Sequence, residues 1–265
     1  MCQYPLLANW KYRFAISANT TCPTTQQCMA IYRLSDEDFD AISSSEKGCA
    51  FLQCPGRVQL AIFELSKLRL PVFRKVNSDR DMCDKIQSIA ERLDNVNLEA
   101  WATEYCAEAD RAVTAANVAR IVVAAVRLYG ILALPKTCAG LWMASSPTMQ
   151  HTVSSGVQGH LEAYNRARVW HRERLLQLLR AAEEYLFEER MLPGGVVWAL
   201  FIAGVAVSDG SEESREFIKS TLTRCSQGPV ASPCFRACAE RLDAVWRQGL
   251  TDWEDCVSEP LVLYA

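Results

Sequence analysis

The chain has 265 residues, half of them hydrophobic, with 31 acidic against 28 basic side chains. This length and apolar content can bury a substantial core, so we expect one large domain, or one domain with a loose N-terminal extension. The formal net charge is -3, so the chain as a whole does not attract nucleic acid electrostatically. Such binding needs a basic face that releases counterions from phosphate.

Twelve cysteines and two apolar runs bear on the compartment. The first ten residues lack a basic segment followed by a long apolar run, so we expect no secretory signal, and free thiols in a reducing compartment. The run 118–134 is interrupted by Arg120 and Arg127, and the run 196–207 is short. Neither matches the roughly 20 residues of a transmembrane helix, so no membrane segment is expected.

The pattern over the first 48 residues predicts a weakly ordered N-terminal extension. Residues 20–27 are polar, with proline and threonine, and predict a loop. Ser35 precedes acidic residues and could cap a short helix.

Helical patterns then follow in quick succession. Apolar residues at helical spacing predict helices over 55–70 and, after a serine cap, over 78–93. Residues 98–134 contain no proline and one glycine, so they predict one long helix or two in close succession, central to the bundle. A loop rich in Ser, Thr and Gly is expected over 136–159, and another helix over 161–191.

The segment 196–207 is apolar around its whole circumference, which is typical of a buried helix. Gly204 inside it costs about 1 kcal/mol relative to alanine, so we expect a neighbouring helix to approach the backbone closely. Ser211 predicts an N-cap, and a last amphipathic helix is expected near 235–248. Because no region alternates with period two, the predicted fold class is all-α, a multi-helix bundle-like domain with a long central helix.

The cysteines and histidines do not match a metal site. A zinc binuclear cluster needs six thiolates in closely spaced pairs, whereas no Cys-x-x-Cys occurs in this sequence. His160 and His171 could share a helical face, yet no third ligand is spaced to complete a site. We therefore predict no metal and no cofactor. The closest cysteine pairs and the third histidine are Cys22/Cys28, Cys49/Cys54, Cys234/Cys238 and His151.

Two acidic clusters could hold magnesium for diphosphate chemistry in a helical enzyme. The first follows a cap residue, where carboxylates favour the helix dipole, and the second alternates with arginines on a solvated face. Motifs typical of nucleotide-binding, hydrolase and zinc-protease sites are absent. We therefore predict no catalytic residue and no enzyme activity. The clusters are Asp36, Glu37 and Asp38, and Glu183, Glu184, Glu188 and Glu189.

Basic and aromatic residues are the remaining candidates. The basic cluster could contact phosphate, but in a net acidic chain it is more typical of a solvated or partner-facing surface. The tryptophans at helical positions are more typical of a core than of a ligand cage, while a pocket between helices stays open. The basic cluster is Arg166, Arg168, His171, Arg172 and Arg174, and the tryptophans are Trp101, Trp198, Trp246 and Trp253.

Four blocks of the sequence resemble one known family, in the same order. One is Trp198-Ala-Leu-Phe-Ile-Ala-Gly204, followed by Arg215-Glu-Phe-Ile218. The others cover 52–68, 119–135 and 245–253. Together they are similar to the fungal-specific transcription factor domain, which usually follows a zinc binuclear cluster.

The resemblance runs from about Cys49 to the C-terminus and is weak from about residue 136 to 164. It departs at Ala199, where the family usually has proline. We therefore expect residues 1–48 to be the extension and residues 49–265 to be the regulatory domain.

The resemblance implies a nuclear regulator of RNA polymerase II genes, expected here without the zinc cluster that reads DNA. Its expected partner is a coregulator or a related transcription factor, in a homodimer or heterodimer, bound in an apolar or mixed groove. Direct nucleic-acid binding is not expected, and a small-molecule effector stays open. The alternatives are a stand-alone interaction module that modulates a full-length relative, or a helical small-molecule-binding protein or enzyme.

Overall fold

A computed structural model describes residues 15–34, 54–143, 157–188, 194–227, 232–261 and 263. All regular structure in these ranges is helical and none of it is strand, which confirms the predicted all-α class. The boundary predicted after residue 48, the short helix after Ser35 and the loop histidine His151 lie outside the described residues.

The first long helices form where the sequence predicts them. Helix α3 (Gly56–Arg69) and helix α5 (Asp79–Asp94) confirm the helices predicted over 55–70 and 78–93. Ser78 caps α5 by accepting a hydrogen bond from the Asp81 backbone N–H, and Asp81 bonds back to the Ser78 N–H. The short helix α4 (Pro71–Val76) begins at the proline that follows α3.

The segment 98–134 forms two helices, which is one of the two predicted alternatives. Helix α6 (Leu98–Tyr105) ends at an extended Cys106, and helix α7 (Ala109–Ala133) follows. A 3₁₀ segment, η4 (Lys136–Met143), occupies the start of the predicted loop, whose residues 144–156 are not described.

Five more helices lie in the described ranges of the second half of the chain. They are α8 (Val157–Glu188), α9 (Gly194–Ala206), α10 (Glu212–Gln227), α11 (Pro233–Gln248) and α12 (Trp253–Cys256). The first four confirm predicted helices, while α12 was not predicted. Ser211 accepts a hydrogen bond from the Ser214 backbone N–H at 3.3 Å, as expected of an N-cap.

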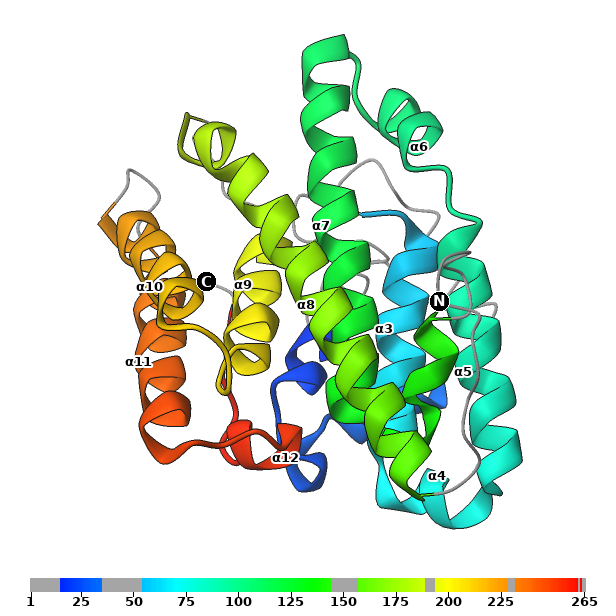
Figure 1. Ribbon diagram of the computed structural model, residues 1–265. Helices are drawn as coiled ribbons and strands as arrows, with labels where there is room; N and C mark the ends of the chain where they lie inside the picture. Colours follow the sequence, from blue (N-terminus) through cyan, green and yellow to red (C-terminus); the bar gives the residue numbers. More distant parts are fainter. Residues whose placement is uncertain are drawn as a thin grey trace.

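Helix α7 is the central element. Figure 1 shows it in the middle of the molecule, with α8 in front, α3 and α5 on one side, and α10 and α11 on the other. In the part of the chain that the structure describes, α7 alone is long and apolar enough to cross a membrane, although the sequence analysis expected no such segment. Its most apolar window is 78% buried inside the molecule, which is the environment of a core helix.

The α9 helix is buried on all sides, as its composition predicts. A Cβ atom on Gly204 would lie 2.4 Å from Leu242 Cδ1 of α11, so the predicted close approach is confirmed. Trp246 on α11 also donates from Nε1 to the Gly204 carbonyl at 2.8 Å. Arg215 donates to the Val207 and Ser208 carbonyls in the turn that follows α9.

A buried arginine joins four distant segments. Arg69, at the end of α3, is 1% exposed and donates to Glu254 of α12 at 3.0 Å. It also donates to Tyr129 of α7, at 3.2 Å, and to the Thr20 carbonyl, at 2.8 Å. Residues 15–34, from within the predicted N-terminal extension, thus contact the centre of the fold. Trp198 and Trp253 both donate to Thr20, at 2.7 and 3.2 Å.

Candidate functional site

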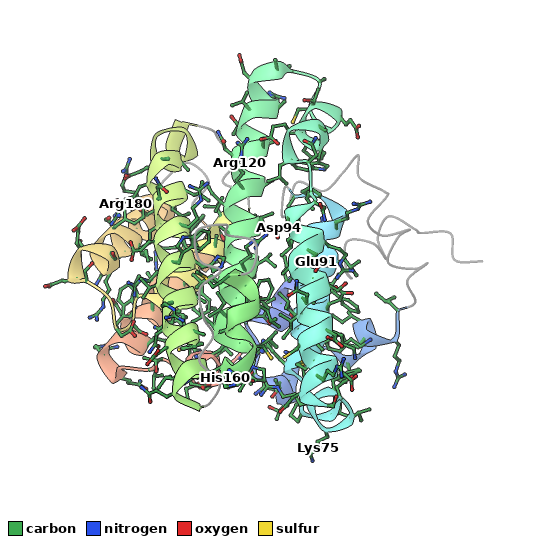
Figure 2. All side chains as sticks on the ribbon, turned by 45° about the vertical axis from the view of Figure 1, so that its right-hand side comes forward. Lys75, Glu91, Asp94, Arg120, His160 and Arg180 are labelled. Carbon is green, nitrogen blue, oxygen red and sulfur yellow. The ribbon has the colours of Figure 1, made fainter. Side chains whose placement is uncertain are left out.

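The described histidines and cysteines do not come together as a set of metal ligands. Within the described ranges, no group of three or more His, Cys, Asp or Glu residues could hold a metal ion. Figure 2 shows His160 near the N-terminal end of α8, far from Arg180 on the same helix. His171, by contrast, is 1% exposed and lies in the interior. The described cysteines other than Cys54 and Cys106 are free thiols.

The described residues of the two acidic clusters do not form a cation site. Asp36 and Asp38 lie outside the described residues, as do the side chains of Glu184 and Glu188. Glu183 accepts a charge-assisted hydrogen bond from Arg224 on α10 at 2.6 Å. That carboxylate therefore joins α8 to α10 on the surface.

The basic cluster on α8 divides into two groups. Arg168 is buried and pairs with both carboxylate oxygens of Asp209, at 2.8 and 2.9 Å, and with the Ala206 carbonyl. Arg172 contacts the same aspartate at 3.7 Å. These two arginines fix α8 to the end of α9, whereas Arg166 and Arg174 are exposed.

The tryptophans likewise divide into buried and partly exposed side chains. Trp198 and Trp253 are core residues, as predicted, and pack edge-on around Tyr129, with ring centroids 5.9 and 5.2 Å away. Trp101 is half-buried and stacks on Tyr105. Trp170 on α8, which the sequence analysis did not single out, is 38% exposed.

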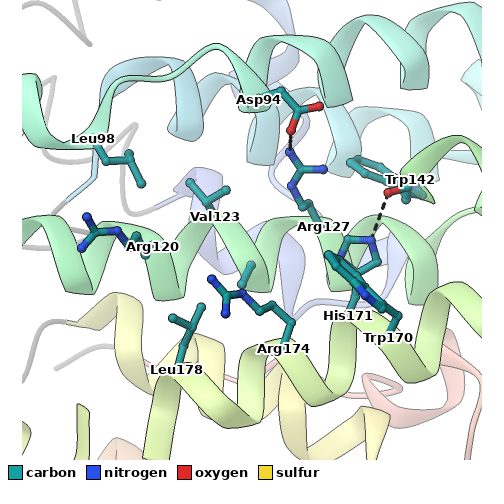
Figure 3. Close-up of a pocket in the computed structure, with 11 residues that line it drawn as sticks. Asp94, Leu98, Arg120, Val123, Arg127, Trp142, Trp170, His171, Arg174 and Leu178 are labelled. Atoms are coloured by element: carbon teal, nitrogen blue, oxygen red, sulfur yellow. Dashed lines mark hydrogen bonds and ion pairs between the residues drawn. The ribbon is translucent and has the colours of Figure 1, made fainter. Parts of the chain in front are cut away.

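A cavity of about 340 Å³ opens between α7 and α8 (Figure 3). One face of α7 and one face of α8 form its walls, because the lining residues recur at helical spacing. The end of α5, the start of α6 and η4 complete it. The lining residues are Asp94, Leu98, Arg120, Val123, Ala124, Arg127, Trp142, Trp170, His171, Arg174 and Leu178.

Trp142 reaches the cavity because α7 has a glycine beneath it. A Cβ atom on Gly130 would lie 2.4 Å from Trp142 Cζ2, so any larger residue would displace the indole. The Trp142 carbonyl accepts a hydrogen bond from His171 Nε2 at 3.1 Å. Because a carbonyl only accepts, Nε2 carries the proton and Nδ1 is left as an acceptor.

Burial lowers the pKa of His171 to about 4, although its hydrogen bond to Trp142 opposes this shift. The ring is therefore neutral at physiological pH and adds no charge to the cavity. Three arginines and one aspartate line the same space, so the lining carries a net positive charge.

The outer face of α8 adjoins this cavity. A shallow depression along it is lined, among the described residues, by side chains of α8, and Trp170 and Arg174 line both spaces. Val169 is 46% exposed there, beside Trp170. The other lining residues are Asn165, Arg166, Glu173, Gln177 and Arg180.

Sequence reasoning found part of this region. The basic cluster pointed to α8 but did not separate Arg174 from the buried Arg168. Arg120 and Arg127 interrupt an apolar run in the sequence, and their seven-residue spacing places both on one face of α7.

The chain belongs to the family of the fungal-specific transcription factor domain, because the model of that family matches residues 4–263. This match confirms the resemblance carried by the four sequence blocks, and it defines the chain as part of a family of transcription regulators. No curated protein and no solved structure matches the chain.

Proposed function

We propose that this chain is a nuclear regulatory domain of RNA polymerase II transcription that acts by binding a coregulator protein, and that it is not an enzyme. Its membership of a transcription factor family supports the regulatory role. The observation that carries the proposed contact is the outer face of α8, where Val169 and Trp170 are exposed side by side.

The chemistry of this face favours an acidic and apolar partner segment. Arg166, Arg174 and Arg180 line the depression with Glu173 as the one described carboxylate, and Arg180 is itself paired with Glu213 at 3.5 Å. Glu173 already accepts from Arg172 at 3.0 Å, so its charge is partly compensated. Exposed aromatic and arginine side chains are typical of the residues that dominate binding energy at protein interfaces.

The proposal is tested by tethering. The chain is fused to an unrelated DNA-binding domain in a fungal reporter strain, and reporter transcription is compared with that of the DNA-binding domain alone. We expect the wild-type fusion to change transcription and Val169→Glu to abolish the change, because a carboxylate there repels an acidic partner and interrupts the apolar contact.

Val113→Glu is the matched control, since Val113 is 63% exposed on a different helix, α7. It should leave the reporter effect intact. A wild-type fusion with no effect, or a Val169→Glu fusion that acts like wild type, would overturn the proposal. If Val169→Glu instead converts a purified dimer to a monomer in sedimentation, the occupant is a second copy of the chain and not a coregulator.

A further inference from the structure

We propose that the cavity between α7 and α8 binds a small molecule that combines a flat apolar body with a carboxylate or phosphate group. The inference concerns a ligand and not the protein partner, and its test uses the isolated chain, so it can fail or succeed independently of the proposed function. Figure 3 shows the arrangement on which it rests.

The size and the walls of the cavity suit such a ligand. Its volume of about 340 Å³ lies at the lower end of small-molecule sites, roughly 300–1,000 Å³. Its walls belong to helices α5, α6, α7 and α8 and to η4. A site between packed helices is already formed before the ligand arrives, which limits the entropy lost on binding.

We infer the ligand's anionic group from the pairing of the three arginines that line the cavity. Arg120 is paired with Glu99, and Arg127 is paired with Asp94. Arg174 donates to the neutral Gln177 amide at 3.1 Å and pairs with no carboxylate among the described residues. Its guanidinium is therefore available for a bidentate contact with a carboxylate or phosphate.

Figure 3 shows the Arg174 side chain in the space between the two helices, near Val123 and Leu178. An anion bound there would meet a positive charge that no described carboxylate offsets, because His171 is neutral and the other two arginines are already paired.

We infer the flat apolar part of the ligand from the aromatic and aliphatic side chains that line the rest of the cavity. Trp170 is held edge-on against His171, with ring centroids 4.5 Å apart, and it exposes part of its ring beside the cavity. Val123, Leu98 and Leu178 are each half-buried there. Trp142 is 2% exposed, and its Nε1–H has no hydrogen-bond partner within the described structure. A planar ligand can cover Trp170 and the three aliphatic side chains and remove their remaining contact with water.

Isothermal titration calorimetry with three probes tests the inference. The probes are 1-naphthoate, 1-naphthyl phosphate and the neutral 1-naphthalenemethanol, which share one ring system. We expect at least one anionic probe to bind about tenfold or more tightly than the neutral probe, a preference of the size that charge-assisted hydrogen bonds supply. The better of the two anions identifies the ligand as a carboxylate or a phosphate.

Two substitutions locate the bound anion. Arg174→Gln should weaken the preferred anionic probe by about tenfold or more and leave the neutral probe unchanged. Arg166→Gln is the matched control, because Arg166 is an exposed arginine of the same helix that lines the depression but not the cavity. It should change binding by less than about twofold, within the usual effect of a distant surface charge.

Three results would each overturn the inference. They are no binding of either anion at millimolar concentration, equal affinity for the neutral probe, or equal losses in the two variants. Both arginines are exposed, so both variants should keep the helical circular dichroism of the wild-type chain.

Discussion

Among single residues, His171 is a buried histidine whose environment changes its pKa. It sits in α8 between the cavity and the interior, and its pKa falls from 6.5 to about 4 mainly because burial penalises the charged ring. In the unfolded chain the ring titrates normally. Between pH 6.5 and pH 4 the unfolded state therefore binds a proton that the folded state does not, and stability falls as the pH is lowered through this window.

This difference predicts a pH effect on unfolding. Between pH 7 and pH 5 the titration of His171 should cost the folded state about 2 kcal/mol, from the free energy per pKa unit. Urea unfolding at both pH values measures the loss. His171→Gln, which keeps a donor for the Trp142 carbonyl, should lose about 2 kcal/mol less than wild type over the same interval.

His160→Gln provides the control on the same helix, since His160 is half-buried and not enclosed like His171. It should keep the wild-type pH dependence. Equal pH dependence in wild type and His171→Gln would show that the buried ring is not responsible.

Between elements, the close contact of α9 with α11 depends on a glycine, which has no side chain. Gly204 allows Leu242 to approach the α9 backbone, and a Cβ atom would lie 2.4 and 2.6 Å from the two Leu242 methyl carbons. Leu242 is fully buried, so its side chain cannot turn out into solvent to avoid the clash. The gain in helix propensity from alanine is about 1 kcal/mol, and overpacking typically costs about 1–3 kcal/mol.

We expect Gly204→Ala to destabilise the protein by up to about 2 kcal/mol in urea unfolding, because the clash exceeds the gain in propensity. Leu242→Ala alone should cost about 2–5 kcal/mol through the cavity it leaves. The double variant should cost clearly less than the sum, because Leu242→Ala removes the atoms that clash.

Gly140→Ala is the comparison, since a Cβ atom there would meet only Ala163 Cβ at 3.9 Å, an ordinary contact. It should change stability by less than about 0.5 kcal/mol. If Gly204→Ala is as stable as wild type, or if the double variant is additive, the close approach does not control this interface.

At the scale of the whole molecule, Arg69 connects segments from both ends of the described chain. It holds carbonyls of residues 19, 20 and 22 together with α7 and α12. The Thr21 hydroxyl and the Leu261 carbonyl also meet at 2.7 Å. The N-terminal and C-terminal segments therefore close over α3 and α7 as one buried polar network.

Removing this arginine should affect the entire fold. Arg69→Met keeps an apolar stem but leaves several buried acceptors without a donor, so we expect a loss of about 3–5 kcal/mol. Arg111→Met is the matched control, because Arg111 is 71% exposed in its pair with Glu108, and such surface pairs contribute about 0–1 kcal/mol. Urea unfolding, or thermal unfolding where Arg69→Met is poorly soluble, measures both. Similar stability in the two variants would contradict the central role of Arg69.

Local pattern predicted the elements well where periodicity and capping agree. The helices α3, α5, α8, α9, α10 and α11 follow from apolar spacing and from caps such as Ser78 and Ser211, because these signals act within a few residues. The short α4 and α12 were not predicted, because four to six residues carry too little periodicity.

The candidate site was less accessible to sequence reasoning. Its lining comes from five elements, and the charge state of each group depends on contacts between them. Arg168 and Arg174 lie six residues apart in one basic cluster, yet one pairs with Asp209 and the other stays exposed. The two side chains lie on different faces of α8, and the α9–α10 turn that supplies Asp209 packs against the face of Arg168.

The amino-acid sequence by itself determined the all-α class, the buried α9 helix with its close neighbour, and the family, because each depends on periodicity or on blocks that are contiguous in the chain. The tertiary structure decided which polar groups are buried together. Arg69, His171 and the cavity between α7 and α8 acquire their properties from residues tens to hundreds of positions away. Desolvation and pairing act through space, so no local pattern reports them.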